Sequence, residues 1–496
     1  MTRAPIGRRR ALGVIALGAV GVAAGTTGWV SGLGAPAGSG RLALGAGGRL
    51  LVQPAVLASR DGVLDVELTA APGVALAGRD TSALGFNGTS PGPTLRVAPG
   101  DLLRIRLTNH LDAPTNLHLH GVHVSPQGRG DNPFLSIAAG SGFDYAYRIP
   151  TDHPTGTYWY HPHHHGYIAD QLFGGLVGAL LIEHGQDLPV AADRVLMITD
   201  TTLDAAGRVV PVGAMDKMMG RQGELVLLNG QHHPAIPATP GVAQRWRIIN
   251  ACTSRVLALR LEQHPLTQIA HDGVFLPAPT DRDQIVLAPA GRADVIVHPA
   301  RAGQYVLVTD PYDRGSGMMG MMSGGATGPI TLATLAVAGP VGSSPPLPAT
   351  LPAPPVPQGP VDGQRALTFA MGMGGMGSGG MGGMGGMGMS FTIDGRGFDA
   401  RRDDQTVRLG STEDWTITNT SSMDHPFHLH VWRFHVLADS TGTPRTATFQ
   451  DVVLIPARGW VRLRILFTDY PGRSVYHCHT ADHEDAGMMG TLTVTT

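Results

Sequence analysis

The sequence is short of cysteine and of charge, and each shortage excludes a class of protein. Only two of its 496 residues are cysteines, which excludes the disulfide framework that holds many small secreted domains together. Charged residues make up 15% of the chain and the formal net charge is −2, so the chain has neither the basic surface of a nucleic-acid-binding protein nor an acidic tail. Beyond the N-terminal leader, no apolar stretch is long enough to cross a membrane. We therefore expect a mature chain that neither binds nucleic acid nor spans a membrane.

Histidine, in contrast, is abundant. The chain has 22 histidines and few lysines, and histidine is the commonest metal ligand in proteins. Hydrophobic residues make up 42% of the chain, which is enough to fill several cores. At about 100–200 residues per domain, the length corresponds to roughly two to four domains. The composition therefore favours a metalloprotein with several domains.

The N-terminus has the features of an export signal. Arg8, Arg9 and Arg10 precede an apolar stretch over residues 11–24, and a glycine-rich segment follows to residue 50. This pattern predicts a twin-arginine-type signal and leader over residues 1–50, and a periplasmic, cell-envelope or extracellular protein. A membrane anchor is the alternative interpretation, but the apolar stretch is shorter than the ~20 residues of a membrane-spanning helix.

After the leader, apolar and polar residues alternate in short runs that Gly, Pro, Asn and Asp separate. This period of two predicts β-strands, for example over residues 102–108, 245–250, 294–298 and 461–467. Long helical periodicity is absent from the sequence. We therefore expect an all-β chain.

A short phrase recurs three times and indicates three domains of similar build. Its copies are Gly85-Phe86-Asn87-Gly88, Leu228-Asn229-Gly230-Gln231 and Ile393-Asp394-Gly395-Arg396, and an alternating strand follows each copy after a gap. We predict β-sandwich domains over residues 51–187, 188–340 and 366–496. A proline-rich, semi-rigid linker is expected over residues 341–365.

Two glycine-rich segments, residues 317–325 and 371–390, hold eleven of the nineteen methionines. Their glycine content disfavours a helix, so we expect mobile loops, the second of them inserted into the third domain. A low-complexity linker is the alternative interpretation, although methionine is not a usual linker residue.

Four short segments contain paired histidines. They are His118-Leu119-His120, His161-Pro162-His163, His428-Leu429-His430 and His477-Cys478-His479. On a strand, residues i and i+2 point to the same face ~7 Å apart, so one pair can serve two neighbouring metal ions. One such pair is weak evidence. Four pairs, two in the first domain and two in the third, can offer eight imidazoles to one cluster.

The segment His477-Cys478-His479 is the most specific of the four. Alternation along a strand directs the Cys478 sulfur to one face and both imidazoles to the other. The thiolate and its two neighbours can therefore bind different metal ions that only a few covalent bonds separate. Cys252 is then left as a buried free thiol.

The ligands that Cys478 needs follow from the preferences of copper. A thiolate with two imidazoles and a long axial thioether is the blue-copper pattern. His425 and His483 supply the imidazoles in this interpretation, and Met488 supplies the thioether, with Met489 as its competitor. Zinc is the alternative metal, but zinc has no use for ten histidines divided among four strands.

Together these segments resemble the signatures of the multicopper oxidases, the family of laccases, ascorbate oxidases and bacterial cuprous oxidases. The resemblance covers nearly all of the chain after residue 50, and its most specific part is the stretch HCHTADHEDAGMM over residues 477–489. It implies three cupredoxin-like Greek-key domains and four copper ions, with a trinuclear site between the first and third domains. By motif position, it implies the type 2 ligands His118 and His428, the type 1 set His425, Cys478, His483 and Met488, and the type 3 ligands His120, His161, His163, His430, His477 and His479.

The resemblance also implies roles for two carboxylates. Reduction of dioxygen to water consumes protons, and a buried cluster needs groups that deliver them. Asp131 and Glu484 occupy positions that resemble the proton-relay acids of the family. A surface aspartate in a turn and a salt-bridged glutamate are the alternative interpretation. His164 and His165, beside the second motif, are expected not to be ligands.

The predicted sites indicate an oxidoreductase that takes single electrons at the type 1 copper and reduces dioxygen to water at the cluster. Thioether sulfur favours Cu(I), and the methionine-rich insertion resembles that of the cuprous-oxidase branch. We therefore expect a monomer that oxidises Cu(I), and also small phenols, in copper tolerance, with a further Cu(I) bound at the methionine-rich loop. Met423 matches a methionine of that branch, whereas Ser421 stands where the branch usually has an acidic residue. The alternatives are a phenol or amine oxidase without a role in copper homeostasis, and a non-enzymatic copper-binding or assembly protein.

Overall fold

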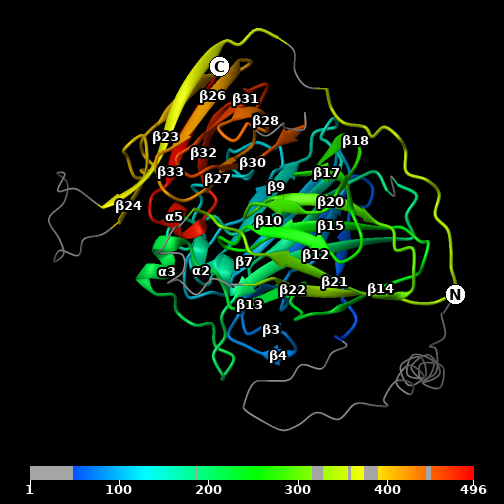
Figure 1. The fold of residues 1–496 in the computed structure, drawn as a ribbon. Coiled ribbons are helices and arrows are strands. Elements are labelled where there is room, and N and C mark those ends of the chain that lie inside the picture. Colours follow the sequence, from blue (N-terminus) through cyan, green and yellow to red (C-terminus); the bar gives the residue numbers. More distant parts are fainter. Residues whose placement is uncertain (1–47, 186–187, 316–327, 356–358, 374–388, 443–447) are drawn as a thin grey trace, which may run out of the picture. The chain divides into compact units, whose positions relative to one another are not determined.

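The computed structural model describes residues 48–496 except 186–187, 316–327, 356–358, 374–388 and 443–447. The predicted export signal, the segment 317–325 and most of the segment 371–390 lie outside the described residues. Nearly all regular structure in the described part is β, which confirms the prediction of an all-β protein. The strands form three pairs of sheets, and each pair comes from one continuous stretch of the chain (Figure 1).

The first sandwich pairs a five-stranded sheet with a four-stranded sheet around one buried cluster that includes Leu68, Leu107 and Tyr160. Burial alternates along its long strands, as the period of two requires. In sheet order, the five strands are β1 (Val56–Ala58), β6 (Thr94–Val97), β11 (Gly178–Ile182), β10 (Gly156–His161) and β8 (His118–His120). The four strands are β5 (Leu84–Phe86), β2 (Val63–Pro72), β7 (Leu102–Asn109) and β9 (Gly142–Arg148), and a small ribbon of β3 (Ala75–Leu76) and β4 (Arg79–Asp80) lies outside them.

The second sandwich pairs a six-stranded sheet with a five-stranded sheet and has its own core around Trp246 and Leu259. The six strands are β13 (Leu225–Leu228), β12 (Ala192–Thr201), β15 (Gln244–Asn250), β20 (Arg292–Val297), β17 (Leu266–His271) and β18 (Val274–Arg282). The five strands are β14 (Ala235–Ala238), β22 (Ile330–Val337), β21 (Gly303–Asp310), β16 (Leu257–Leu261) and β19 (Ile285–Leu287).

The third sandwich repeats the sheet order of the second, and Trp415 and Phe427 lie in its core. Its six strands are β24 (Met389–Ile393), β23 (Gly363–Met373), β26 (Thr412–Asn419), β31 (Trp460–Leu466), β28 (Phe434–Asp439) and β29 (Phe449–Gln450). Its five strands are β25 (Gln405–Arg408), β33 (Met489–Thr495), β32 (Gly472–Cys478), β27 (His425–Leu429) and β30 (Val452–Ile455).

The recurring phrase of the sequence forms the same turn in all three sandwiches. Asn87, Asn229 and Asp394 have φ angles of 54°, 49° and 53°, in the left-handed region that Asn, Asp and Gly tolerate best. In each copy the side-chain Oδ1 accepts a hydrogen bond from a backbone N–H of the neighbouring strand, at 2.7–2.9 Å. The three copies therefore close equivalent strand pairs, and the inference of a threefold structural repeat holds.

Three short helices lie together where the sandwiches meet, and Figure 1 shows them side by side: α2 (Ile168–Gly174), α3 (Ala214–Met219) and α5 (Ala481–Asp485). Arg221, which follows α3, is buried and links the other two helices. Its guanidinium lies 2.6 Å from Asp170 of α2 and 2.6 Å from Asp482 of α5. No helix of the described residues is long and apolar enough to cross a membrane.

The structure differs from the sequence prediction at the edges of three segments. Residues 371–373 and 389–390, expected to belong to a loop, pair as the ends of the β23–β24 hairpin. The strand β23 begins at Gly363, inside the range expected for the linker. Leu51, directly after the expected leader, donates its N–H to the Ala235 carbonyl at 2.8 Å, and Leu50 bridges to the same residue. Backbone pairing with a neighbouring strand decides all three edges, and it leaves no signature in the local pattern.

Candidate metal centre

Four of the predicted histidines lie at the ends of two neighbouring strands of the first sandwich. His118 and His120 are on β8, and His161 ends β10 as the register partner of His118. His163 follows two residues later and is also buried. Because the strands are antiparallel neighbours, the His118 and His161 ring centroids are only 5.3 Å apart.

The third sandwich presents its histidines in the same way. His428 of β27 is the register partner of His477 of β32, and His430 and His479 follow these strands. In sheet order, β27 and β32 hold the places that β8 and β10 hold in the first sandwich. The corresponding strands of the second sandwich, β16 and β21, carry no histidine.

The eight imidazoles converge from the two sandwiches into one buried region. Within each group described below, ligand atoms of all members lie within 4.8 Å of one another. The groups are His118, His120 and His428; His120, His161 and His479; and His163, His430 and His477. The sequence prediction of one shared cluster between the first and third sandwiches agrees with this geometry.

The ring nitrogen atoms in this region are placed so that they can bind metal ions. The Nε2 atoms of His163, His430 and His477 lie 3.1–3.2 Å from one another, a spacing in which at most one of each pair can donate a proton to the other. Within the described residues, the Nε2 atoms of His118, His120, His161 and His428 are buried and have no hydrogen-bond partner. Such an atom costs about 1–3 kcal/mol if it stays unsatisfied. Imidazole nitrogens and a thiolate are the donors that copper prefers, so the residues present fit copper.

Burial keeps most of these imidazoles in the neutral form that binds metal. Desolvation, and after it the neighbouring imidazoles, holds the pKa values well below the usual 6.5 for His118, His120, His161, His428 and His430. At His163 burial acts in the same direction, but the Glu484 carboxylate outweighs it and raises the pKa. A metal cation and a proton compete for the same nitrogen, so low pKa values favour metal binding.

In His118, His161 and His428, the ring nitrogen that points away from the cluster has a fixed partner. The Nδ1 atom of His118 lies 2.8 Å from Asp131 Oδ2, and that of His161 lies 2.8 Å from the Pro162 carbonyl oxygen. His428 Nδ1 lies 2.7 Å from the Asp451 carbonyl oxygen. Each contact holds the proton on Nδ1, so that Nε2 is left free as a ligand atom.

Both carboxylates that the sequence singled out border the cluster. Glu484 Oε1 is 2.8 Å from His163 Nε2, and Oε2 is 3.1 Å from His477 Nδ1. Asp131 also accepts the Leu119 N–H at 3.0 Å, and burial raises the pKa of its carboxyl to about 7. Asp131 is 2% exposed and is therefore not the surface aspartate of the alternative interpretation, whereas Glu484 is 0% exposed and does pair with two histidines.

A second buried group surrounds Cys478. Its sulfur lies 3.3 Å from His425 Nδ1 and 3.9 Å from His483 Nδ1. Met488 is fully buried in the same cluster of side chains, and its backbone carbonyl accepts the Cys478 N–H at 3.0 Å. In the absence of metal, burial raises the pKa of the Cys478 thiol to about 12, so the thiolate needs a cation beside it. The other cysteine, Cys252, is buried and free, as predicted.

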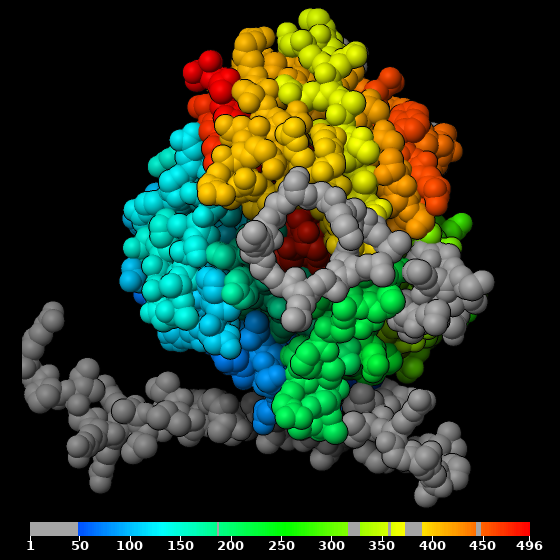
Figure 2. All heavy atoms as spheres, turned by 90° about the vertical axis from the view of Figure 1, so that its left-hand side faces the viewer, coloured from blue at the N-terminus to red at the C-terminus, as the bar shows by residue number. Residues whose placement is uncertain are grey.

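The protein itself covers the outer edges of both imidazoles around Cys478. His425 Nε2 lies 2.8 Å from Ser421 Oγ, and His483 Nε2 donates to the Met218 carbonyl oxygen of α3 at 3.0 Å. In Figure 2 a patch of the red C-terminal segment is visible between the green segment below it and the yellow-orange segment of the third sandwich above it.

Cys478 connects the two metal-binding regions through its own backbone. Its neighbour His477 belongs to the group with His163 and His430, and its neighbour His479 belongs to the group with His120 and His161. Its sulfur belongs to a separate group. The alternation that the sequence predicted for this strand is therefore present, and it joins a thiolate site to a cluster of imidazoles.

Comparison with known proteins agrees with this arrangement. Three family models described as multicopper oxidase match residues 69–187, 155–336 and 376–496. The chain belongs to the multicopper oxidase family. A solved structure titled "Multicopper oxidase from Campylobacter jejuni: a metallo-oxidase" is 30% identical, with a TM-score of 0.80 over 91% of this chain and 96% of that one. The three-domain cupredoxin fold and copper binding follow from membership, as does an oxidoreductase activity with oxygen as acceptor.

Relatives with different names share this family. A multicopper oxidase mco of Staphylococcus aureus is 27% identical over 84% of this chain and 85% of its own length. A cell division protein FtsP of Dickeya dadantii is 26% identical over 84% of this chain and 85% of its own length. Because the relatives carry different names, the role of this multicopper oxidase has to be inferred from the residues of its own site.

The structure also places the histidines that were not expected to be ligands. His164 Nε2 lies 2.8 Å from Ser136 Oγ, and the His165 ring packs against Phe398 with 4.7 Å between centroids. Neither belongs to a metal-binding group of the described residues. Sequence reasoning missed Asp451 and Arg292, which contact the outer side of the cluster, because no spacing links them to a histidine motif.

Proposed function

We propose that this multicopper oxidase binds four copper ions and couples the one-electron oxidation of a reductant to the four-electron reduction of dioxygen to water. When bound, the copper ions supply the one-electron redox chemistry and the oxygen-reducing cluster. The proposed ligands are, for type 1, His425, Cys478, His483 and Met488; for type 2, His118 and His428; and for type 3, His120, His161, His163, His430, His477 and His479. The single observation that carries the proposal is the position of Cys478 between two residues of the imidazole cluster.

In this proposal the two buried carboxylates relay protons to the place where dioxygen is reduced. Glu484 contacts His163 of the first sandwich and His477 of the third. Both belong to the group that also contains His430, so Glu484 borders the place where oxygen binds in this proposal. The Asp131 carboxylate contacts Nδ1 of His118, the ring nitrogen that points away from the cluster. General acids at such positions typically contribute 10²–10⁴-fold to a proton-transfer step.

Metal analysis together with an absorption spectrum tests the proposed sites. We expect about four copper ions per chain and an intense orange-red band from thiolate-to-copper charge transfer, as in blue-copper sites. A colourless protein, or one that retains only zinc, would contradict the proposal.

Cu(I) is the reductant that the surroundings of Cys478 favour. Both outer imidazole nitrogens there are occupied by Ser421 Oγ and the Met218 carbonyl, so a bulky phenol has no imidazole edge to contact. Partly buried Met218, Met371 and Met389 pack against the same cluster of side chains that contains Cys478. Soft thioethers favour Cu(I), and with the methionine-rich segments nearby in sequence they support a cuprous oxidase that acts in copper tolerance.

Ser421 stands where cuprous oxidases usually have an acidic residue, and its side chain makes contacts within the protein. Its hydroxyl contacts Asn419 Oδ1 at 2.7 Å and His425 Nε2 at 2.8 Å. We therefore propose that the substrate Cu(I) is held by methionine sulfur without help from Ser421. Export through the twin-arginine route, to the compartment where Cu(I) would be met, and a monomeric state remain part of this proposal.

Replacing the methionines of residues 374–388 tests the reductant. A variant with Met376, Met381, Met384 and Met387 all changed to Leu keeps the length and apolarity of the segment and removes only its sulfur atoms. We expect slower Cu(I) oxidation at low Cu(I) concentration, with phenol oxidation unchanged. Unchanged Cu(I) kinetics would contradict the collecting role and favour the phenol or amine oxidase. Replacing residues 374–388 by a short Gly-Ser turn, which leaves the β23–β24 hairpin intact, should slow Cu(I) oxidation equally.

A further inference from the structure

We propose that Arg292, from the second sandwich, is a positioning residue for the copper cluster and acts through Asp451 on His120 and His428. The inference rests on the proposed copper cluster and goes beyond its ligands. In the described residues, the second sandwich contributes no side chain to any of the metal-binding groups. The second sandwich nevertheless places the fully buried guanidinium of Arg292 at the outer side of the cluster.

Arg292 and Asp451 form a paired, two-point contact. Arg292 Nη1 donates to Asp451 Oδ1 at 2.7 Å, and Nη2 donates to Oδ2 at 2.6 Å. Their side chains are 0% and 1% exposed, so water does not compete for these bonds. A fork-to-fork contact of this kind fixes the orientation of the carboxylate as well as its position.

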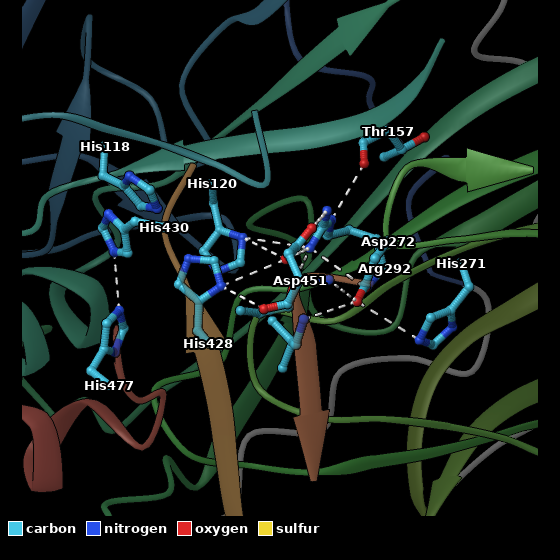
Figure 3. A network of polar contacts seen from close by, with 12 residues as sticks. His118, His120, Thr157, His271, Asp272, Arg292, His428, His430, Asp451 and His477 are labelled. Carbon is cyan, nitrogen blue, oxygen red and sulfur yellow. Dashed lines mark hydrogen bonds and ion pairs between the residues drawn. The ribbon is translucent and has the colours of Figure 1, made fainter. Parts of the chain in front are cut away.

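Asp451 contacts two imidazoles that belong to different sandwiches. Its Oδ1 lies 3.3 Å from His120 Nδ1, and its carbonyl oxygen lies 2.7 Å from His428 Nδ1 (Figure 3). The two rings stack with 3.8 Å between centroids and 19° between planes. Arg292 Nη1 is 3.5 Å from the same His120 nitrogen, but two N–H donors cannot bond to each other, so the carboxylate is the partner of His120.

Asp272, also from the second sandwich, holds the other members of this network. Its Oδ1 accepts the Arg292 backbone N–H at 2.9 Å. Its Oδ2 accepts the N–H groups of Asp451 and Val452 at 3.3 and 3.2 Å. The second sandwich therefore fixes both the side chain and the backbone of Asp451. The two carboxylates raise the pKa of Arg292 although burial lowers it, so the cation persists.

Gly121, directly after the first His-Leu-His segment, shows how closely this network is packed. A Cβ atom at this position would collide with the guanidinium of Arg292 and the carboxylate of Asp451. Its φ of 81° also favours glycine. The glycine that ends the motif HLHG thus makes room for the pair that orients the histidine before it.

The variant Arg292→Lys tests the proposal, because lysine keeps the charge and loses the two-point contact. Arg245→Lys is the control: two N–H groups of the buried Arg245 donate to one carboxylate oxygen of Asp294 on the same sheet, and the other oxygen accepts from Thr157 and not from an imidazole of the cluster. Loss of a contact that orients a metal ligand typically costs 10–100-fold in metal affinity. We expect Arg292→Lys to release cluster copper to a chelator at 10–100-fold lower chelator concentration and to alter the electron paramagnetic resonance spectrum of that copper. The blue band should stay.

Arg245→Lys should lower thermal stability but leave the copper affinity of the cluster and its electron paramagnetic resonance spectrum unchanged. If Arg292→Lys keeps wild-type copper affinity and spectrum while losing stability as Arg245→Lys does, the role of Arg292 is only structural and the proposal is wrong. Should Arg292→Lys fail to fold, Asp451→Asn decides by the same two measurements, because it keeps the backbone carbonyl contact to His428 and weakens the carboxylate contacts to Arg292 and His120. A wild-type protein that binds no cluster copper would overturn both this inference and the proposed function.

Discussion

The guanidinium of Arg221 and the carboxylate of Asp482 form a buried ion pair, with 2.6 Å between Nη2 and Oδ1. Arg221 belongs to the second sandwich, and Asp482 belongs to α5 of the third. The next two residues of α5 are His483, which contacts the Cys478 sulfur, and Glu484, which contacts the imidazole cluster. Asp485 then accepts the backbone N–H groups of Gly166 and Ala169, at 2.7 and 2.8 Å. Within this helical turn, the first and last of the four residues thus hold the sandwiches together, and the two between them contact the proposed sites.

Asp482→Asn should destabilise the protein and disturb the type 1 site at the same time. Removing one partner of a buried ion pair costs about 3–5 kcal/mol, because the other charge stays buried. We expect a lower thermal midpoint and a shifted blue band, since α5 carries His483. Asp144→Asn is the control: its pair with Arg106 is exposed, and such pairs contribute about 1 kcal/mol or less. Equal effects of the two variants would contradict the assigned role of α5.

Cys478→Ser should remove one copper ion and the blue colour and leave the imidazole cluster loaded. The hydroxyl of serine is a poor replacement for a soft thiolate, whereas no histidine of the cluster needs the sulfur atom. Metal analysis should show one copper fewer per chain than wild type, and oxidase activity should be lost. Cys252→Ser replaces the other buried thiol, whose sulfur lies 3.7 Å from the Ile198 carbonyl, and should keep the blue band. A blue Cys478→Ser protein would remove the type 1 assignment.

Glu484→Gln should slow the reaction with dioxygen and leave electron entry unchanged. Glutamine has nearly the same shape but cannot carry the proton, so we expect a 10²–10⁴-fold slower reoxidation. Rapid-mixing measurements can follow bleaching of the blue band by reductant and its return with oxygen. Asp485→Asn is the neighbouring control, because Asp485 contacts backbone N–H groups before and within α2. If reoxidation slows to a similar extent in both variants, Glu484 has only a structural role in α5 and the proposed proton-relay role is wrong.

The copper-free protein should lose stability in acid. Burial lowers the pKa of His435 to about 4 and holds that of His153 well below the usual value. Since the unfolded chain binds these protons near pH 6.5 and the folded chain does not, the free energy of unfolding should fall as pH decreases from about 6.5 toward 4. Urea unfolding at several pH values checks this. A flat profile, or greater stability at pH 5 than at pH 7, would contradict it. His435→Asn should flatten part of the slope.

Much of this architecture is readable in the local sequence because it follows from the period of two. Alternation along a strand determines that His118 and His120 share a face, and that Cys478 points away from its two neighbours. The turn residues Asn87, Asn229 and Asp394 mark the threefold repeat for the same reason, since their backbone conformation is a local preference. The all-β class, the shared cluster and the thiolate site could therefore be predicted.

Tertiary packing alone decided the surroundings of these ligands. Arg292 and Asp451 are 159 residues apart, and Arg221 and Asp482 are 261 apart, so no local pattern relates the members of either pair. The same is true of the Met218 carbonyl that covers His483. The sequence by itself determined which atoms can bind metal, because side-chain direction on a strand is a local property. Which buried partners orient those atoms depends on how three sandwiches pack, and packing is decided by contacts between distant parts of the chain.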